Sequence, residues 1–230
     1  MSRNKLHTVY KNSEGKRLVG VSSVKGQLGW NTRGLMYWVK KCSLQGLDFE
    51  EVSRLGAGVG TLTHNFIKDY FLKSESCMID EFTKIEIDKA SNSYLSFLEW
   101  VQDKDILPSI VELGLVSEKY QFGGTPDLYC KYKLKSEKEY SNVLLDWKSG
   151  KGIYKEDLVQ VVGGYTLLLE ENNHQYDKII LLNIPKEEDD KFAEVVIDQP
   201  DIIAGCQKIF LALRDVYDTK KIFNGIGGIK

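Results

Sequence analysis

The sequence predicts an α/β fold, in which helices flank a mixed central β-sheet and the N-terminal part is helical. Apolar residues recur every three or four positions through the first hundred residues, a spacing typical of amphipathic helices. Short apolar or alternating runs follow, which are typical of strands. The resulting order is helices, three strands, a helix, two strands and a helix, as in a layered α/β domain.

The composition indicates one globular domain. The chain has 230 residues, of which 42% are hydrophobic and 28% are charged, and these values exclude a disordered chain or a long coiled coil. The net charge is -2, so no general basic excess attracts a polyanion. Binding to nucleic acid would therefore require a local basic patch or a bound metal ion.

The cysteines and the apolar segments predict a soluble protein of the cell interior, expected in the cytoplasm. The four cysteines lie far apart without a CxxC pair, which disfavours a zinc ribbon or a thioredoxin-type site. Residues 1–17 lack the apolar core of a signal peptide. No apolar stretch approaches the roughly 20 residues that span a bilayer, so no membrane partner is expected.

Three helices are expected in the N-terminal part, residues 1–105. The first covers residues 33–44. The second starts after Asp48, which could cap it together with Glu51, is interrupted at Gly56, Gly58 and Gly60, and resumes through Phe71. The third covers residues 82–102. The three glycines suggest a tight turn or a close helix approach, and a Walker-type phosphate loop is disfavoured because no Gly-Lys-Ser/Thr ending follows.

The α/β core is expected at residues 106–200, followed by a C-terminal helix at 201–218, all within a single domain. Its expected strands are residues 111–116, 128–132, 142–148, 178–184 and 192–197, and its helix is 156–171. Because that helix connects the strand near Asp146 to the strand near Ile180, these two strands should be parallel.

The charged residues in these strands have two interpretations. Asp127 starts one strand, and Asp146 and Lys148 share one face of the next because side chains two apart in a strand point the same way. In the first interpretation, Asp146 and Lys148 form an ion pair worth about 0–1 kcal/mol. In the second, Asp127 and Asp146 share Mg²⁺ or Mn²⁺, which relieves a repulsion of roughly 4 kcal/mol between them, and Lys148 contacts a water or a phosphate.

The surrounding motifs favour the second interpretation. The stretch from Val111 to Asp127 contains Glu112 and ends in Gly-Gly-Thr-Pro-Asp; Asp146-Trp-Lys148 follows, and a helix then carries Gln160 and Tyr165. This pattern resembles the PD-(D/E)XK nuclease superfamily, in particular its RecB-like and phage-exonuclease branch. The resemblance covers residues 55–165 well and the two ends of the chain weakly.

The resemblance implies a restriction-endonuclease-like core and a set of site residues. The implied catalytic residues are Glu112, Asp127, Asp146, Lys148, Gln160 and Tyr165. The implied metal ligands are His64, Asp127, Asp146 and the carbonyl of Trp147, and the imidazole of His64 tilts the preference from Mg²⁺ towards Mn²⁺. Glu118 is an alternative to Glu112. The iron–sulfur form of the superfamily is disfavoured because Cys206 stands alone near the C-terminus.

The implied function is that of a metal-dependent deoxyribonuclease, expected to be an exonuclease in DNA repair, recombination or phage DNA processing. Its partners would be single- or double-stranded DNA and a phage recombination or single-strand-binding protein. Two alternatives stay open: a non-catalytic nucleic-acid-binding module that kept the fold, and an assembly subunit whose acidic pocket is only structural.

Several of these residues also have plainer interpretations. His64 could simply pack in its helix, and the lysines at 148, 151 and 155 could grip phosphates or form a solvated loop. Gln160 and Tyr165 are roughly 500° of helical rotation apart, which predicts neighbouring sides of the helix rather than one line. The four tryptophans are expected in the core, although an exposed ring could stack on an unpaired base.

Overall fold

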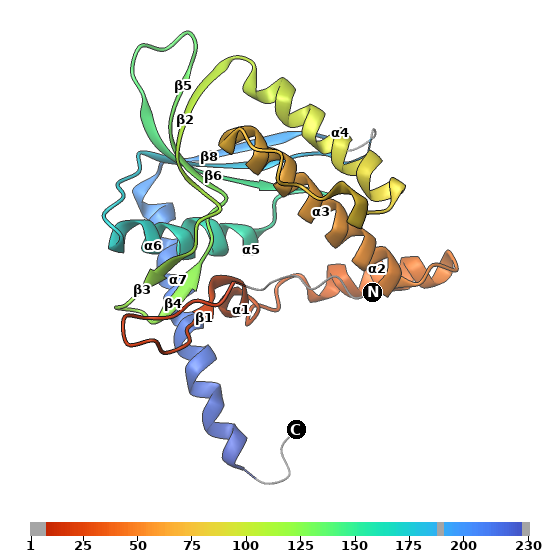
Figure 1. Cartoon of the computed structure of the whole chain (residues 1–230). Helices are drawn as coiled ribbons and strands as arrows, with labels where there is room; N and C mark the ends of the chain where they lie inside the picture. The colour runs from red at the N-terminus through yellow and green to blue at the C-terminus, as the bar shows by residue number, and fades with distance from the viewer. Residues whose placement is uncertain (1–7, 188–190, 227–230) are drawn as a thin grey trace.

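A computed structural model describes residues 8–187 and 191–226, and it confirms the α/β fold with a mixed sheet (Figure 1). The main sheet has the order β2 (Lys104–Val111), β5 (Leu128–Leu134), β6 (Ser141–Lys148), β7 (Lys178–Asn183) and β8 (Ala193–Ile197). Strands β6 and β7 are parallel, as predicted, and the other neighbours are antiparallel. None of the described helices is both long and apolar enough to cross a membrane.

A second, three-stranded sheet was not predicted. It has the order β1 (Val19–Gly20), β4 (Phe122–Gly124) and β3 (Leu115–Ser117), and its strands are too short to produce an alternating pattern. The predicted strand at 111–116 is not one strand, because β2 ends at Val111, the next residue, Glu112, has a φ of 44°, and β3 begins only at Leu115. This left-handed conformation turns the chain away from the main sheet before β3 begins.

Helices cover both faces of the main sheet. The helices are α1 (Val21–Lys25), α2 (Thr32–Leu44), α3 (Phe49–Leu72), η1 (Ile79–Glu81), α4 (Lys84–Val101), α5 (Lys155–Leu158), the π-helical η2 (Val159–Tyr165), α6 (Thr166–Glu171), α7 (Pro200–Thr219) and η3 (Lys220–Gly225). Ile67 and Phe97, from α3 and α4, pack on the face that carries Leu145. Phe210 of α7 packs on the opposite face with Leu144. Two covered faces explain why β6 and β7 are almost continuously apolar.

Helix α3 runs unbroken through the three glycines, so the predicted interruption is wrong. Asp48 caps its start by accepting a hydrogen bond from the Glu50 N–H at 2.9 Å. The expected close approach is present instead, because a Cβ added to Gly60 would lie 3.1 Å from Ser149 Oγ. The small residues therefore let the loop after β6 approach the helix that carries His64.

Candidate metal centre

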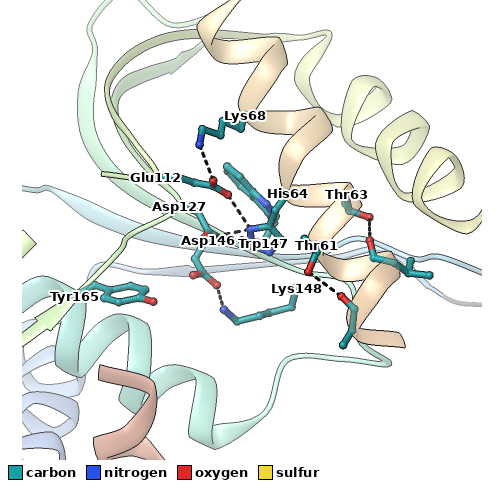
Figure 2. A network of polar contacts seen from close by, with 12 residues as sticks. Thr61, Thr63, His64, Lys68, Glu112, Asp127, Asp146, Trp147, Lys148 and Tyr165 are labelled. Carbon is teal, nitrogen blue, oxygen red and sulfur yellow. Dashed lines mark hydrogen bonds and ion pairs between the residues drawn. The ribbon is translucent and has the colours of Figure 1, made fainter. Parts of the chain in front are cut away.

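His64, Glu112 and Asp127 lie close together, although they come from three separate segments (Figure 2). His64 lies on α3, Glu112 follows β2 and Asp127 precedes β5. His64 Nδ1 lies 3.3 Å from Glu112 Oε1 and 3.5 Å from Asp127 Oδ1. One ligand atom from each of the three residues lies within 4.8 Å of the others, so a single cation could touch all three.

The pairing of β2 with β5 places the two carboxylates side by side. Val111 is the antiparallel partner of Leu128, so the residues that flank this pair are Glu112 and Asp127. The Glu112 N–H donates a hydrogen bond to the Asp127 carbonyl at 3.0 Å. Glu118, the alternative acid, instead accepts a hydrogen bond from the Ser13 N–H in the N-terminal segment. This placement favours Glu112 as the acid of the site.

Asp127 is buried and held by the neighbouring strand. Its Oδ2 accepts a hydrogen bond from the Trp147 N–H at 3.1 Å. Burial, followed by the negative charge of Asp146, raises the pKa of Asp127 to about 7. A carboxylate in this position is costly to ionise without a nearby cation, and a divalent metal ion would remove that cost.

Asp146 and Lys148 share one face of β6, as predicted, and form an ion pair (Figure 2). Asp146 is buried, and its Oδ2 has no hydrogen-bond partner within residues 8–187 and 191–226. Burial lowers the pKa of Lys148, but the carboxylates of Asp146 and Asp127 outweigh this effect and raise it above its ordinary value. The lysine is therefore a permanent cation beside the cluster.

The residues that cluster in the structure differ from the predicted metal ligands. The cluster of His64, Glu112 and Asp127 includes Glu112, which was predicted as catalytic and not as a ligand. The predicted ligand Asp146 lies next to this cluster and faces Lys148. Coordination by Asp146 and by the Trp147 carbonyl stays a prediction. The Trp147 side chain is fully buried, and its ring centroid lies 5.6 Å from that of His64. The buried ring of Trp147 thus packs against the imidazole of His64.

A π-helical turn aligns Gln160 with Tyr165, which corrects the expectation that they lie on neighbouring sides. Both residues belong to η2, whose i to i+5 periodicity brings residues five apart nearly into line. Gln160 Nε2 donates a hydrogen bond to the Tyr165 hydroxyl at 2.9 Å. Burial, followed by the charge of Asp146, raises the pKa of Tyr165, so its hydroxyl stays protonated beside the Asp146–Lys148 pair.

An open pocket of about 600 Å³ leads to the cluster. One wall is the small-residue face of α3, with Gly56, Gly60 and His64, and the other is the loop after β6, with Ser149 and Gly150. The lysine at 148 lines this pocket. The pocket is therefore wide enough for a substrate group to reach the cluster from solvent.

Lys68 is a site residue that the sequence interpretation missed. It lies one helical turn after His64, and its Nζ is 3.5 Å from Glu112 Oε2 (Figure 2). Its four-residue spacing from His64 could have identified it, because such residues share a helix face. Lys68 adds a second cation on the side of the cluster opposite Lys148.

The donor set suits a divalent cation of moderate hardness. Two carboxylates are ligands that Mg²⁺ and Mn²⁺ prefer, and an imidazole favours Mn²⁺ over Mg²⁺. Burial lowers the pKa of His64, but the charge of Asp127 and the hydrogen bond with Glu112 raise it more, which shows that the two carboxylates favour a positive charge at this position. His64, Glu112 and Asp127 therefore fit a metal ion chemically.

Comparisons with known proteins leave the family open. No protein-family model matches the chain, and no curated protein matches it. Among solved structures, one described as "Crystal structure of SSO0001" is 14% identical, and the match covers 76% of this chain and 85% of that chain. Its TM-score is 0.29. The case for function therefore depends on the site itself.

Proposed function

We propose that this protein is a metal-dependent nuclease, an exonuclease that hydrolyses phosphodiester bonds in DNA. The observation that supports this most is the convergence of His64, Glu112 and Asp127 within 4.8 Å at an open pocket. The Asp146–Lys148 ion pair lies directly beside that cluster. The resemblance of the same residues to the PD-(D/E)XK pattern supports the same reaction.

The residues divide the work of hydrolysis in the proposed reaction. His64, Glu112 and Asp127 would hold Mg²⁺ or Mn²⁺, which polarises a phosphate oxygen and makes a water more acidic. Lys148 orients the attacking water or offsets the negative charge that develops on the phosphate. Tyr165, fixed by Gln160, keeps a neutral hydroxyl beside this lysine. Lys68 restrains Glu112 on the other side.

The proposed biological role follows from the resemblance. We place the activity in DNA repair, recombination or phage DNA processing inside a bacterial or phage-infected cell. DNA would be the main partner, with a phage recombination or single-strand-binding protein as a second one. A near-neutral chain is compatible with this role, because the metal ion and local lysines would supply the attraction for phosphates.

The direct test is digestion of end-labelled single- and double-stranded DNA in Mn²⁺, Mg²⁺ or EDTA, with product lengths followed over time. We expect product ladders that start from one end in Mn²⁺ and no products in EDTA. Asp127→Asn and Lys148→Met should each lower the rate at least about a hundredfold, since the first weakens a metal ligand and the second removes the cation beside the reacting phosphate. Lys208→Met, on the exposed side of α7, is the matched control and should digest DNA normally.

The same assay identifies the alternative. A folded protein that binds DNA equally well in EDTA and Mn²⁺, and cleaves in no metal, would be a non-catalytic binding module. Cleavage that persists unchanged in both Asp127→Asn and Lys148→Met would place the active site elsewhere. Circular dichroism of each variant establishes that the fold is retained before rates are compared.

A further inference from the structure

A second groove adjoins the candidate metal pocket. It measures about 730 Å³ and lies between α2, the first half of α3 and the loops that follow β6 and β7. Gly56 and Tyr154 line both the groove and the metal pocket, so the two cavities lie side by side at these residues.

Lysines line much of the groove, although the chain as a whole is weakly acidic. Among residues 8–187 and 191–226, its lining contains the lysines at 41, 89, 151 and 186 and one acidic residue, Glu187. Glu187 forms an ion pair with Lys89. Lys41 and Lys151 come from two further segments, the helix α2 and the loop after β6. A positive strip assembled from separate segments of a chain with net charge -2 is suited to a polyanion.

Aromatic side chains accompany these lysines. Tyr37 of α2 is 72% exposed and Tyr154 is 45% exposed, although both line the groove. Trp38 lies beside them, and its ring is held edge-on by Phe49 at a centroid distance of 6.4 Å. Exposed aromatic rings together with lysines are the usual surface for unpaired bases, because stacking needs a free base face. A duplex offers no such faces along its length.

We infer that this groove binds the unpaired strand of a nucleic-acid substrate next to the metal pocket. The inference rests on the proposed nuclease function for its substrate, but not on catalysis for its test. Helix α2 forms the outer wall, and Figure 1 shows it extending away from the central sheet. On this helix Gly34, Trp38 and Lys41 follow one another at three- and four-residue spacing, which gives one face for the strand.

The test is binding of a fluorescein-labelled single-stranded oligonucleotide and of the corresponding blunt duplex, measured by anisotropy in EDTA. The variant Tyr37→Ala/Lys41→Ala removes one exposed ring and one exposed lysine, so the core is untouched. We expect its affinity for the single strand to fall about tenfold or more. The slope of log affinity against log salt should also fall by about 0.7, because one phosphate contact is lost. Duplex affinity should change less than about twofold.

A matched control carries the same two residue types elsewhere. Tyr140→Ala/Lys138→Ala alters the exposed loop between β5 and β6, at the end of β6 away from Lys148, and should bind the single strand normally. An unchanged single-strand affinity in the groove variant would overturn the inference, as would an equal loss for single strand and duplex.

Failure of the nuclease proposal would look different. Hydrolysis of bis(p-nitrophenyl) phosphate, a small phosphodiester, in Mn²⁺ tests the metal pocket, whose lining does not include the groove residues Tyr37 and Lys41. If the wild-type protein does not hydrolyse it or DNA, the nuclease proposal fails while the binding result still decides the groove. If the groove variant hydrolyses it at the wild-type rate, but binds the single strand weakly, the inference is supported.

Discussion

Replacing Asp146 or Lys148 alone should destabilise the protein, because the two side chains form a buried ion pair. The Asp146 carboxylate is buried, and Lys148 provides its only ion pair within the described part of the chain. Removing one partner of a buried pair leaves an uncompensated charge, which costs more than removing both. Stability and the proposed catalysis therefore place different demands on the same two residues.

We expect Lys148→Met to lower the free energy of unfolding by about 3 kcal/mol. The double variant Asp146→Asn/Lys148→Met should recover most of this loss, because it removes the stranded charge. Urea unfolding in EDTA measures both quantities. Neither variant should cleave DNA, so the double variant would be stable but inactive. A double variant that is as unstable as the single one would show that Asp146 carries no uncompensated charge.

At the scale of an element, the π-helical segment η2 is fixed by its contact with α7. A Cβ added to Gly163 would lie 2.6 Å from the Cys206 carbonyl oxygen, which is backbone and cannot move aside alone. We expect Gly163→Ala to destabilise the protein by about 1–3 kcal/mol and to reduce nuclease activity, because η2 carries Gln160 and Tyr165. Thermal unfolding and the DNA digestion assay measure the two effects.

Gly205→Ala is the control on the facing helix. It lies in the second turn of α7, and an added Cβ meets nothing within 4 Å. Alanine has a higher helix propensity than glycine, so this variant should be more stable by up to about 1 kcal/mol. If both alanine variants behaved alike, the close packing of η2 on α7 would not be what positions this segment.

The C-terminal end of α3 offers a prediction about pH. The Asp69 carboxylate accepts hydrogen bonds from the hydroxyls of Ser74 and Ser76, each at 2.6 Å, and from the Cys77 N–H at 3.0 Å. Burial raises the pKa of Asp69, but these hydrogen bonds outweigh it and leave the pKa below its ordinary value. The ionised carboxylate thus fastens the loop after α3 to the helix.

Asp69→Asn should lower the unfolding temperature at pH 7 by roughly 2–4 °C, the size expected for a weakened hydrogen-bond group. A lowered folded-state pKa contributes stability above the unfolded-state pKa and loses it as pH falls through the folded-state value. The difference from wild type should therefore shrink as pH falls below about 4. Thermal unfolding at pH 7 and pH 3 measures this change, and a constant difference would contradict it.

For the whole molecule, the strongly patterned elements were predictable and the irregular ones were not. The sequence indicated β6, β7 and their parallel pairing, because a long apolar helix separates two apolar runs. It did not reveal the sheet formed by β1, β3 and β4, whose strands have two or three residues. Nor did it reveal that α3 continues through Gly56 and Gly60. The low helix propensity of glycine predicted an interruption there, but the packing of the helix outweighs this propensity.

In the candidate site, too, the contacts within regular elements were predictable and those that depend on irregular backbone were not. Asp146 and Lys148 could be placed on one face from the strand period alone. The contact of Glu112 with His64 depends on the left-handed backbone conformation of Glu112 after β2, which no sequence pattern predicts. The alignment of Gln160 with Tyr165 depends on a π-helical turn that the ordinary helical period conceals. The regular helices and strands therefore bring the site residues into one region, and irregular backbone positions put them in contact.

Because the candidate ligands come from α3, the end of β2 and the start of β5, a bound cation would tie the N-terminal helices to the sheet. A ligand that binds only the folded state stabilises it by about 2.7 kcal/mol at a hundred times its dissociation constant.

For a chain of this length we expect Mn²⁺ to raise the unfolding temperature by about 5–10 °C above its value in EDTA. His64→Ala should abolish most of this rise, whereas His174→Ala, whose ring packs on Tyr129 away from the cluster, should keep it. Differential scanning calorimetry with and without Mn²⁺ measures the rise within each variant, so a lower starting stability does not confuse the comparison. An equal rise in the two histidine variants would mean that the cation binds outside the His64, Glu112 and Asp127 cluster.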